Sequence, residues 1–225
     1  INIDTDEKLD NLVAKIKNES LIAVDTETSS LNPLEAKLIG ISLCSKEGIS
    51  YYISIAHNSG KNVSLEKSLE KLKIILEDKS IKKIGQNIKY DIMVLKKYGI
   101  QINSFEDTML LSYTLDAGLN RHNLDLLSEI HLGHKTIQYK DLVGSGKKKL
   151  NFNEVDINKA TEYAAEDADV TFRLYKYFKT RLDEDKLNSI YENFEKPMVS
   201  VLSKMEENGI KVDKDYLVDL SKKFQ

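Results

Sequence analysis

This sequence has a single cysteine, no long apolar run and no excess of positive charge, and each of these features excludes a class of protein. The single cysteine, Cys44, rules out an intrachain disulfide, and its place after the apolar run Ile39–Leu43 favours a role in the core. No apolar stretch approaches the ~20 residues of a membrane-spanning helix, and no signal-peptide pattern is present. We therefore expect a monomeric, cytoplasmic, globular protein with no membrane partner.

The net charge of −3 argues against a broadly basic nucleic-acid-binding surface, but one local basic segment is present. Lys147, Lys148 and Lys149 follow two glycines in the segment GSGKKKL. These lysines could follow a phosphate backbone or belong to a solvated loop, and the sequence leaves both interpretations open. The nearby pair His131 and His134 has no thiol partners, so zinc binding there is not favoured.

Two acidic residues follow an apolar strand near the N-terminus. The apolar run Leu21–Val24 ends in a polar stretch closed by Pro33. Because side chains alternate along a strand, Asp25 and Glu27 point to the same face. A strand this apolar is typically central and covered on both sides, so both carboxylates should open onto a covered site.

Two further acids fall on the apolar faces of helices. Asp91 lies three residues after Ile88, on the buried stripe of one helix. Asp167 falls within the stripe of a longer helix over residues 156–181, and Tyr163 lies one turn earlier on the same face. Any one of these acids could instead cap a turn or pair with a buried lysine or arginine. Three separate segments that each direct an acid to the core are harder to explain in that way.

As a group, these four acids require compensating cations. Moving one unpaired carboxylate out of water costs several kcal/mol, and mutual repulsion raises that cost. Oxygen ligands favour hard ions, so we expect Asp25, Glu27, Asp91 and Asp167 to hold two Mg²⁺ or Mn²⁺ ions. Two such ions about 3.5–4 Å apart could hold a phosphodiester between them.

The remaining pattern predicts a mixed α/β sheet flanked by helices. Amphipathic helices are expected over residues 6–18 and 65–77, the second with Leu65, Leu69, Leu72 and Leu76 as its buried stripe. Strands are expected near residues 20–26, 37–44, 49–55 and 83–85, the first three as antiparallel neighbours and the last added in parallel. From Ile88 onward the chain should be mostly helical, with a helix after Asp183 that is interrupted at Pro197.

The segments around the acids resemble a known family. Asp-x-Glu, Asn-x-x-x-Asp and Tyr-x-x-x-Asp occur in that order within VDTETSSLNP, GQNIKYDIMVLKKYGI and YAAEDADVT. This order is similar to the DEDD superfamily of 3′-5′ exonucleases with a tyrosine in the last motif. Within it, the segments DTMLLSYTLDAG, RHNLDLLSE and HKTIQYKDLVGSGKK are most similar to the proofreading domain of bacterial DNA polymerase I. The resemblance covers essentially the whole chain.

This resemblance implies a ribonuclease H-like fold and a metal-dependent DNA exonuclease that releases nucleoside 5′-monophosphates from 3′ ends. It implies that the four acids and Tyr163 are catalytic, with the Tyr163 hydroxyl orienting the attacking water; a core aromatic is the structural alternative. The positions that correspond to substrate contacts in the family are Leu31, Gln86, Asn87, Arg121 and Tyr139. Leu31 and Asn87 could instead be turn and cap residues. Tyr139 stands where relatives have phenylalanine. The ring is retained, so base stacking should survive, but the added hydroxyl is less suited to an apolar pocket than phenylalanine.

The C-terminal segment YENFEKPMVSVLSKMEENGIKVD is similar to the stretch that leads into the polymerase portion of such enzymes. We therefore divide the chain into an exonuclease domain at residues 1–184 and a truncated helical start of the polymerase portion at residues 185–225. The expected partners are single-stranded DNA 3′ ends and a polymerase domain in the same parent protein, with nucleoid association through DNA. Two alternatives are a ribonuclease D-like RNA exonuclease, disfavoured by this segment, and a non-catalytic polymerase scaffold, disfavoured by the four acids.

Overall fold

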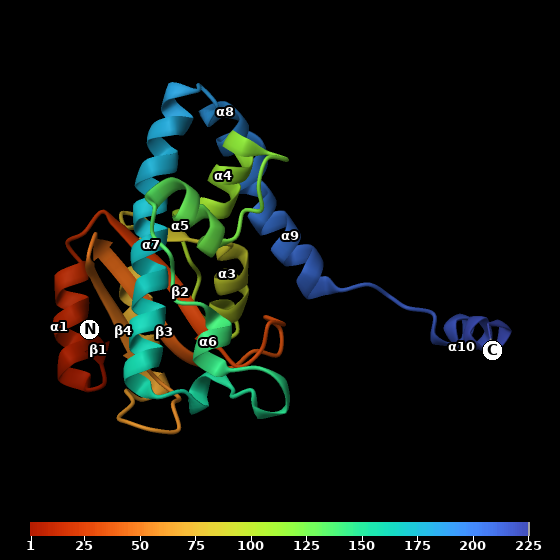
Figure 1. The fold of residues 1–225 in the computed structure, drawn as a ribbon, viewed down its shortest axis with the longest axis horizontal. Helices are drawn as coiled ribbons and strands as arrows, with labels where there is room; N and C mark the ends of the chain where they lie inside the picture. Colours follow the sequence, from red (N-terminus) through yellow and green to blue (C-terminus); the bar gives the residue numbers. More distant parts are fainter. Residues whose placement is uncertain (225) are drawn as a thin grey trace.

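A computed structural model describes residues 1–224, with only the backbone described at Lys147. Within those residues, a mixed sheet has the strand order β1-β4-β3-β2-β5-β6 and is flanked by helices (Figure 1). The strands are β1 (Asn2–Ile3), β2 (Leu21–Thr28), β3 (Leu38–Lys46), β4 (Ile49–Ser54), β5 (Lys82–Gly85) and β6 (Phe105–Asp107). The predicted α/β class is confirmed.

Strand pairing follows the prediction through most of the sheet. β2, β3 and β4 pair in antiparallel fashion, and β5 joins β2 in parallel after a helical crossover. The sequence pattern does not predict β1 and β6, which pair in parallel with β4 and β5. With two and three residues, these strands are too short to show alternation.

Helices cover both faces of the sheet. Those on the N-terminal side of the chain are α1 (Asp6–Ile16), α2 (Leu65–Leu76), α3 (Ile88–Lys96), α4 (Thr108–Asp116) and α5 (Leu124–Leu132). They are followed by α6 (Tyr139–Val143), the 3₁₀ turns η1 (Gly146–Lys148) and η2 (Phe152–Glu154), and the long helix α7 (Ile157–Glu184). The C-terminal segment comprises α8 (Asn188–Ile190), the π-helical turn η3 (Tyr191–Glu195), α9 (Lys196–Asn208) and α10 (Lys214–Lys223). Among the described residues, no helix combines the length and the apolar character needed to cross a membrane.

Alternation along β2 sends successive side chains to two separate cores. Ile22 and Val24 pack with α1, α2 and α3 on one face of the sheet. Ala23 packs with α5 and α7 on the other face. α7 lies across β2, β3 and β4 (Figure 1). Asp25 and Glu27 follow Ala23 at steps of two residues, so they point toward the α7 side.

One predicted helical stripe is wrong in part. On α2 the buried residues are Ser68, Leu72, Ile75 and Leu76. Leu69 is only partly buried, and Leu65, in the first turn, is 37% exposed. The buried face of α2 is therefore rotated toward Ser68 and Ile75. The prediction used only the regularly spaced leucines and so missed these two residues.

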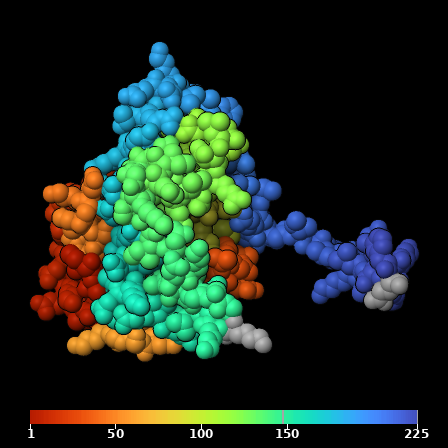
Figure 2. Space-filling view, viewed as in Figure 1, coloured from red at the N-terminus to blue at the C-terminus, as the bar shows by residue number. Residues whose placement is uncertain are grey.

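The C-terminal segment begins packed on the body of the protein and then leaves it. Tyr191 is fully buried, and its hydroxyl accepts a hydrogen bond of 3.0 Å from the backbone N–H of Asp107. The predicted interruption at Pro197 is found as the π-helical turn η3, whose last bond runs from the Lys196 N–H to the Tyr191 carbonyl. Beyond α9 the chain runs away from the body, and α10 stands apart from it (Figures 1 and 2).

Candidate active site

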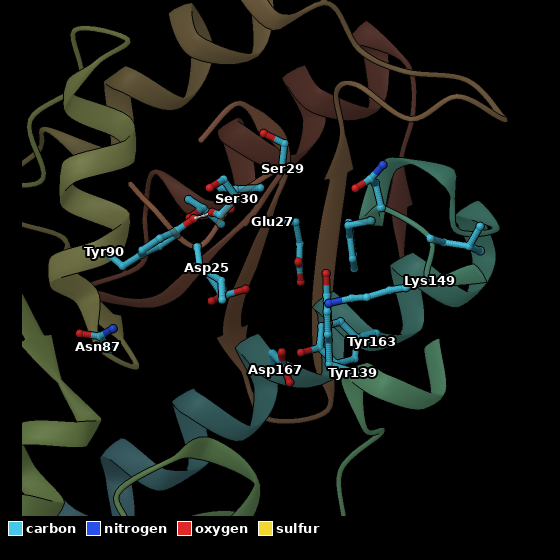
Figure 3. Close-up of a pocket in the computed structure, with 16 residues that line it drawn as sticks. Asp25, Glu27, Ser29, Ser30, Asn87, Tyr90, Tyr139, Lys149, Tyr163 and Asp167 are labelled. Atoms are coloured by element: carbon cyan, nitrogen blue, oxygen red, sulfur yellow. Dashed lines mark hydrogen bonds between the residues drawn. The ribbon is translucent and has the colours of Figure 1, made fainter. Parts of the chain in front are cut away.

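Three of the four predicted acids meet at one point of the fold. β2 supplies Asp25 and Glu27, and α7 supplies Asp167 from the helix that crosses the same face. One carboxylate oxygen from each residue can be chosen so that all three oxygens lie within 4.8 Å of one another. Figure 3 shows these side chains converging on a single cavity. The sequence prediction that β2 and α7 bring acids together is therefore correct in geometry.

The fourth acid, Asp91, approaches from α3 on the other face of the sheet. Its Oδ1 accepts hydrogen bonds of 2.9 Å from the Thr26 backbone N–H and 2.6 Å from the Thr26 hydroxyl. β5 pairs with β2 only as far as Ala23, so the Thr26 N–H has lost its strand partner on that side and Asp91 takes its place. Asp91 therefore sits beside the three-acid cluster, fixed to the residue between Asp25 and Glu27.

Burial and mutual repulsion dominate the electrostatics of these acids. Burial raises the pKa of Asp25 to about 6. Burial, followed by the charges of the neighbouring acids, raises the pKa values of Glu27, Asp91 and Asp167 well above the usual range for carboxylic acids. Among the described side chains, no lysine or arginine forms an ion pair with any of the four. The alternative in which buried basic residues neutralise them is therefore wrong for the described part of the chain.

This donor set fits a hard divalent cation. It consists of carboxylate oxygens alone, gathered from two rigid elements and partly shielded from water. Because ionising the group without a cation is unfavourable, metal binding would relieve a cost that the fold itself creates.

Tyr163 lies one turn before Asp167 on α7 and faces the same cavity (Figure 3). Burial raises the pKa of its phenol far above the ordinary value, and the charge of Asp167 adds to the rise. In return, hydrogen bonding from the Tyr163 hydroxyl lowers the pKa of Asp167. Both effects favour the protonated phenol, which can act as a hydrogen-bonding group beside Asp167.

A cluster of three aromatic rings also lines the cavity. Tyr139 from α6 and Phe152 from η2 are parallel within 5°, with ring centroids 6.3 Å apart. Tyr163 is inclined to both rings, at centroid distances of 5.9 Å and 6.1 Å. The cavity has a volume of about 660 Å³, and it is also lined by Leu31, Asn87 and Lys149.

The predicted substrate-contact residues divide between two cavities that share Asn87. Leu31, Asn87 and Tyr139 line the cavity that contains the acids. Gln86, Asn87 and Arg121 line a second cavity of about 820 Å³, which is mostly apolar. Leu31 is 96% exposed, so its side chain has no packing role in the body.

Asn87 adopts the left-handed backbone conformation, with φ of 58°, at the start of α3. Its side chain makes no capping hydrogen bond there. Asp107 caps this end instead, because its carboxylate accepts from the N–H groups of Asn87 and Ile88 at 3.1 Å and 2.9 Å. Asn87 thus occupies the N-cap position of α3, as one alternative expected, but its side chain does not cap the helix and lines both cavities.

Two residues that line the cavity, Tyr90 and Phe152, were not predicted from the sequence. The Tyr90 hydroxyl donates to the Ser30 carbonyl and is hydrogen-bonded with the Thr28 hydroxyl, so it ties the loop after β2 to α3. Tyr90 is adjacent to Asp91 within the second motif, which is the one signal that could have identified it. Phe152 lies in a short 3₁₀ turn with no periodic pattern, so no local signal selects it.

The residues expected to have structural roles lie away from the acids. Cys44 is fully buried in a core cluster, and burial raises the pKa of its thiol to about 11. The His131 ring packs against Tyr177 and Phe178, while His134 Nε2 lies 2.8 Å from a carboxylate oxygen of Glu166.

Comparisons with known proteins agree with this geometry. A family model described as 3′-5′ exonuclease matches residues 1–183. A DNA polymerase I from Rhizobium leguminosarum is 44% identical over 95% of this chain, which covers 23% of that relative. The chain thus spans about a quarter of the length of the curated relatives it matches.

Solved structures share the fold. The polymerase domain of Pol1 from M. smegmatis, in complex with DNA primer-template and dNTP, superposes with a TM-score of 0.78 at 18% identity, covering all of this chain and 35% of that one. Brucella melitensis NrnC with bound Mg²⁺ superposes with a TM-score of 0.64 at 25% identity, covering 87% of this chain and 90% of that one. The ribonuclease H-like fold expected from the sequence is confirmed.

Proposed function

Because this chain belongs to the 3′-5′ exonuclease family of bacterial DNA polymerase I, we propose that it trims single-stranded DNA from the 3′ end and edits for an attached polymerase. The observation that carries this proposal is the convergence of Asp25, Glu27 and Asp167 within 4.8 Å inside a cavity. Three uncompensated acids on rigid elements are costly to the fold, and a metal-dependent hydrolase is the function that accounts for that cost.

We assign one divalent ion, Mg²⁺ or Mn²⁺, to Asp25, Glu27 and Asp167, and a second to Asp25 and Asp91. Ions held by these acids would lower the pKa of a water and would neutralise charge on the departing 3′ oxygen. The Mg²⁺ bound in the similar Brucella NrnC structure supports the choice of metal. The hydrogen bonds from Thr26 hold one oxygen of Asp91, which leaves its other oxygen to serve as a ligand.

Tyr163 is assigned to position the attacking water. Its phenol keeps its proton because burial and the Asp167 charge raise its pKa. It can therefore accept a hydrogen bond from water at the oxygen or donate one, but it cannot remove the proton at neutral pH. The products are nucleoside 5′-monophosphates.

The two cavities offer a path for an unpaired strand. The terminal nucleotide would occupy the acid-lined cavity beside Tyr139 and Leu31. The nucleotides before it would pass Asn87, which lines both cavities, toward Gln86 and Arg121. Aromatic rings can hold an unpaired base without reading its identity, as an editing enzyme requires.

Residues 185–225 are proposed to lead into a polymerase portion carried in cis, in a parent protein that is monomeric, cytoplasmic and associated with the nucleoid through DNA. The length of the curated relatives supports this division. α9 is fixed to α3 by ion pairs of Lys89 with Glu206 and of Lys96 with Glu207. α3 also carries Asp91, so the connecting segment lies directly behind one of the acids.

The test is trimming of a 5′-labelled single-stranded DNA oligonucleotide with Mg²⁺ or Mn²⁺, beside an RNA of the same sequence. We expect a ladder shortened from the 3′ end on DNA, which disappears with EDTA and in an Asp167→Ala variant. Preferential trimming of the RNA would transfer the assignment to a ribonuclease D-like enzyme. A folded protein that gains thermal stability with metal but trims neither strand would act as a scaffold.

A further inference from the structure

One basic side chain, Lys149, lines the acid-lined cavity among the residues that the structure describes. Asp25, Glu27 and Asp167 supply the acidic groups, and among the side chains that the structure describes Lys149 supplies the basic one. Figure 3 shows Lys149 reaching from its loop across the cavity toward the rings of Tyr139 and Tyr163. Because the acids are assigned to divalent cations, Lys149 is the basic side chain, among the described residues that line the cavity, that is left to bind a phosphate oxygen outside the metal sites.

The structure distinguishes Lys149 from its neighbour in the basic segment. The Lys149 Nζ lies 5.8 Å from the centroid of the Tyr139 ring, while Lys148 is exposed and does not line the cavity. The backbone holds Lys149 at the cavity rim, because its N–H donates to the Gly146 carbonyl at 3.2 Å and the Leu150 N–H donates to the Val143 carbonyl at 2.9 Å.

Lys149 forms no ion pair with any described acid, although the chain carries 36 aspartates and glutamates. A lysine ammonium is a strongly hydrated point charge with three donors on a flexible stem. In this position the Tyr139 ring contacts the charge only weakly from one side, which leaves its donors for an incoming anion.

We infer that Lys149 binds a phosphate oxygen of the last two nucleotides of the DNA strand, and so sets the position of the 3′ terminus over the acids. This inference rests on the proposed exonuclease function. Arg121 lines the other cavity, so the two basic residues serve different phosphates along the strand. Lys149 is thus a substrate-binding residue whose loss weakens the productive seating of the terminal nucleotide.

The test compares Lys149→Gln with the matched control Lys148→Gln, by measuring kcat and KM for trimming of single-stranded DNA over a series of salt concentrations. Removing one phosphate contact should lower kcat/KM about five- to tenfold, mainly through KM. The slope of log kcat/KM against log salt should become shallower by about 0.7. Lys148→Gln should keep the wild-type slope, and Lys149→Arg should restore most of the lost activity.

The contact is local to the 3′ end, so the Lys149→Gln defect should persist on a trinucleotide. Equal salt slopes for wild type and Lys149→Gln, or equal changes in the two glutamine variants, would overturn the inference and leave the exonuclease function standing. Failure of the wild-type protein to trim DNA would instead remove the proposed function, and the inference with it. Both substitutions are at exposed positions, so unchanged melting temperatures verify that folding is intact.

Discussion

The two sides of the acid-lined cavity are built on opposite physical principles. The acid side, formed by Asp25, Glu27 and Asp167, stands on a central strand and a long helix, and it is electrostatically unfavourable until a cation binds. The aromatic side, formed by Tyr139 and Phe152, comes from short elements in a connecting segment, and contacts between rings favour it in every state. The repelling carboxylates are held by rigid elements, while favourable contacts between the rings order the short, irregular segments that carry them.

The aromatic side has its own buried foundation. The Tyr52 hydroxyl lies 2.7 Å from His57 Nε2, and the His57 ring packs 5.7 Å from the Phe152 ring. Asn62 fixes the His57 backbone through two hydrogen bonds of 2.9 Å. A side chain at Gly40 would place its Cβ 2.1 Å from the Tyr52 hydroxyl, so glycine is what allows this foundation to fit. Next to the acid side, hydrogen bonds from Thr26 hold Asp91 in a comparable way.

The largest expected effect comes from the acid side, where activity and stability should change in opposite directions. Asp25→Asn should lower the trimming rate about a thousandfold, the equivalent of roughly 4 kcal/mol of transition-state stabilisation, because Asp25 is assigned to both ions. The same variant should unfold at higher denaturant concentration than wild type in EDTA at pH 8, since a costly ionised group has been removed. Single-turnover trimming and urea unfolding measure the two effects.

The pH dependence gives the sign of that stability change. The folded-state pKa of Asp25 is raised to about 6, above its unfolded value near 3.9. Its contribution to stability is therefore present below pH ~4 and is lost as the pH rises through about 6, and Asp25→Asn should abolish that part of the loss. Asp169→Asn on α7 is the control, because Asp169 lies outside the cavity and its carboxylate accepts a hydrogen bond from the Gly48 N–H. A metal-free Asp25→Asn protein that is no more stable than wild type at pH 8 would contradict the cost assigned to the acid side.

On the aromatic side, activity and stability should fall together. Phe152→Ala removes a ring that is 2% exposed, and truncations of this kind cost about 3–5 kcal/mol. The loss of contact with Tyr139 and Tyr163 should raise KM more than it lowers kcat, because the acids are untouched. Urea unfolding and steady-state kinetics at saturating metal make the measurement.

Phe152→Leu, which keeps much of the apolar volume, should lose less than half as much stability as Phe152→Ala. If Phe152→Ala kept wild-type stability while activity fell, the ring would act on the substrate directly and the comparison between the two sides would fail.

The same contrast explains how much the sequence could predict. The four acids are conspicuous because each lies among the apolar residues of a strand or helix: Asp25, Glu27, Asp91 and Asp167. In such regular elements the spacing along the sequence predicts the direction of each side chain. The sequence also yielded the antiparallel strands and the parallel addition of β5. It did not predict that Asp91 approaches from the opposite face to α7 and is held by the Thr26 backbone N–H and hydroxyl, between Asp25 and Glu27.

The aromatic side could not be assembled in this way. Phe152 and Lys149 lie in a segment of short turns, where no periodicity relates one residue to the next. Their positions depend on tertiary contacts, such as those of Phe152 with His57 and Tyr163, that join residues far apart in sequence. Tyr139 was predicted from the family resemblance, which identifies the residue but does not explain which contacts place its ring in the cavity.

The smallest expected effect, from Tyr139→Phe, sharpens the comparison because the same change can be made at Tyr163. The Tyr139 side chain is 40% exposed, and its hydroxyl forms no hydrogen bond with a described residue. Its removal should therefore change KM and kcat by less than about twofold, with the ring still available for stacking. Tyr163→Phe removes a hydroxyl beside Asp167 and should lower kcat about ten- to a hundredfold with little change in KM. Equal losses from the two variants would mean that the hydroxyl beside Asp167 has no special part in placing the water, and that both rings serve only to hold the base.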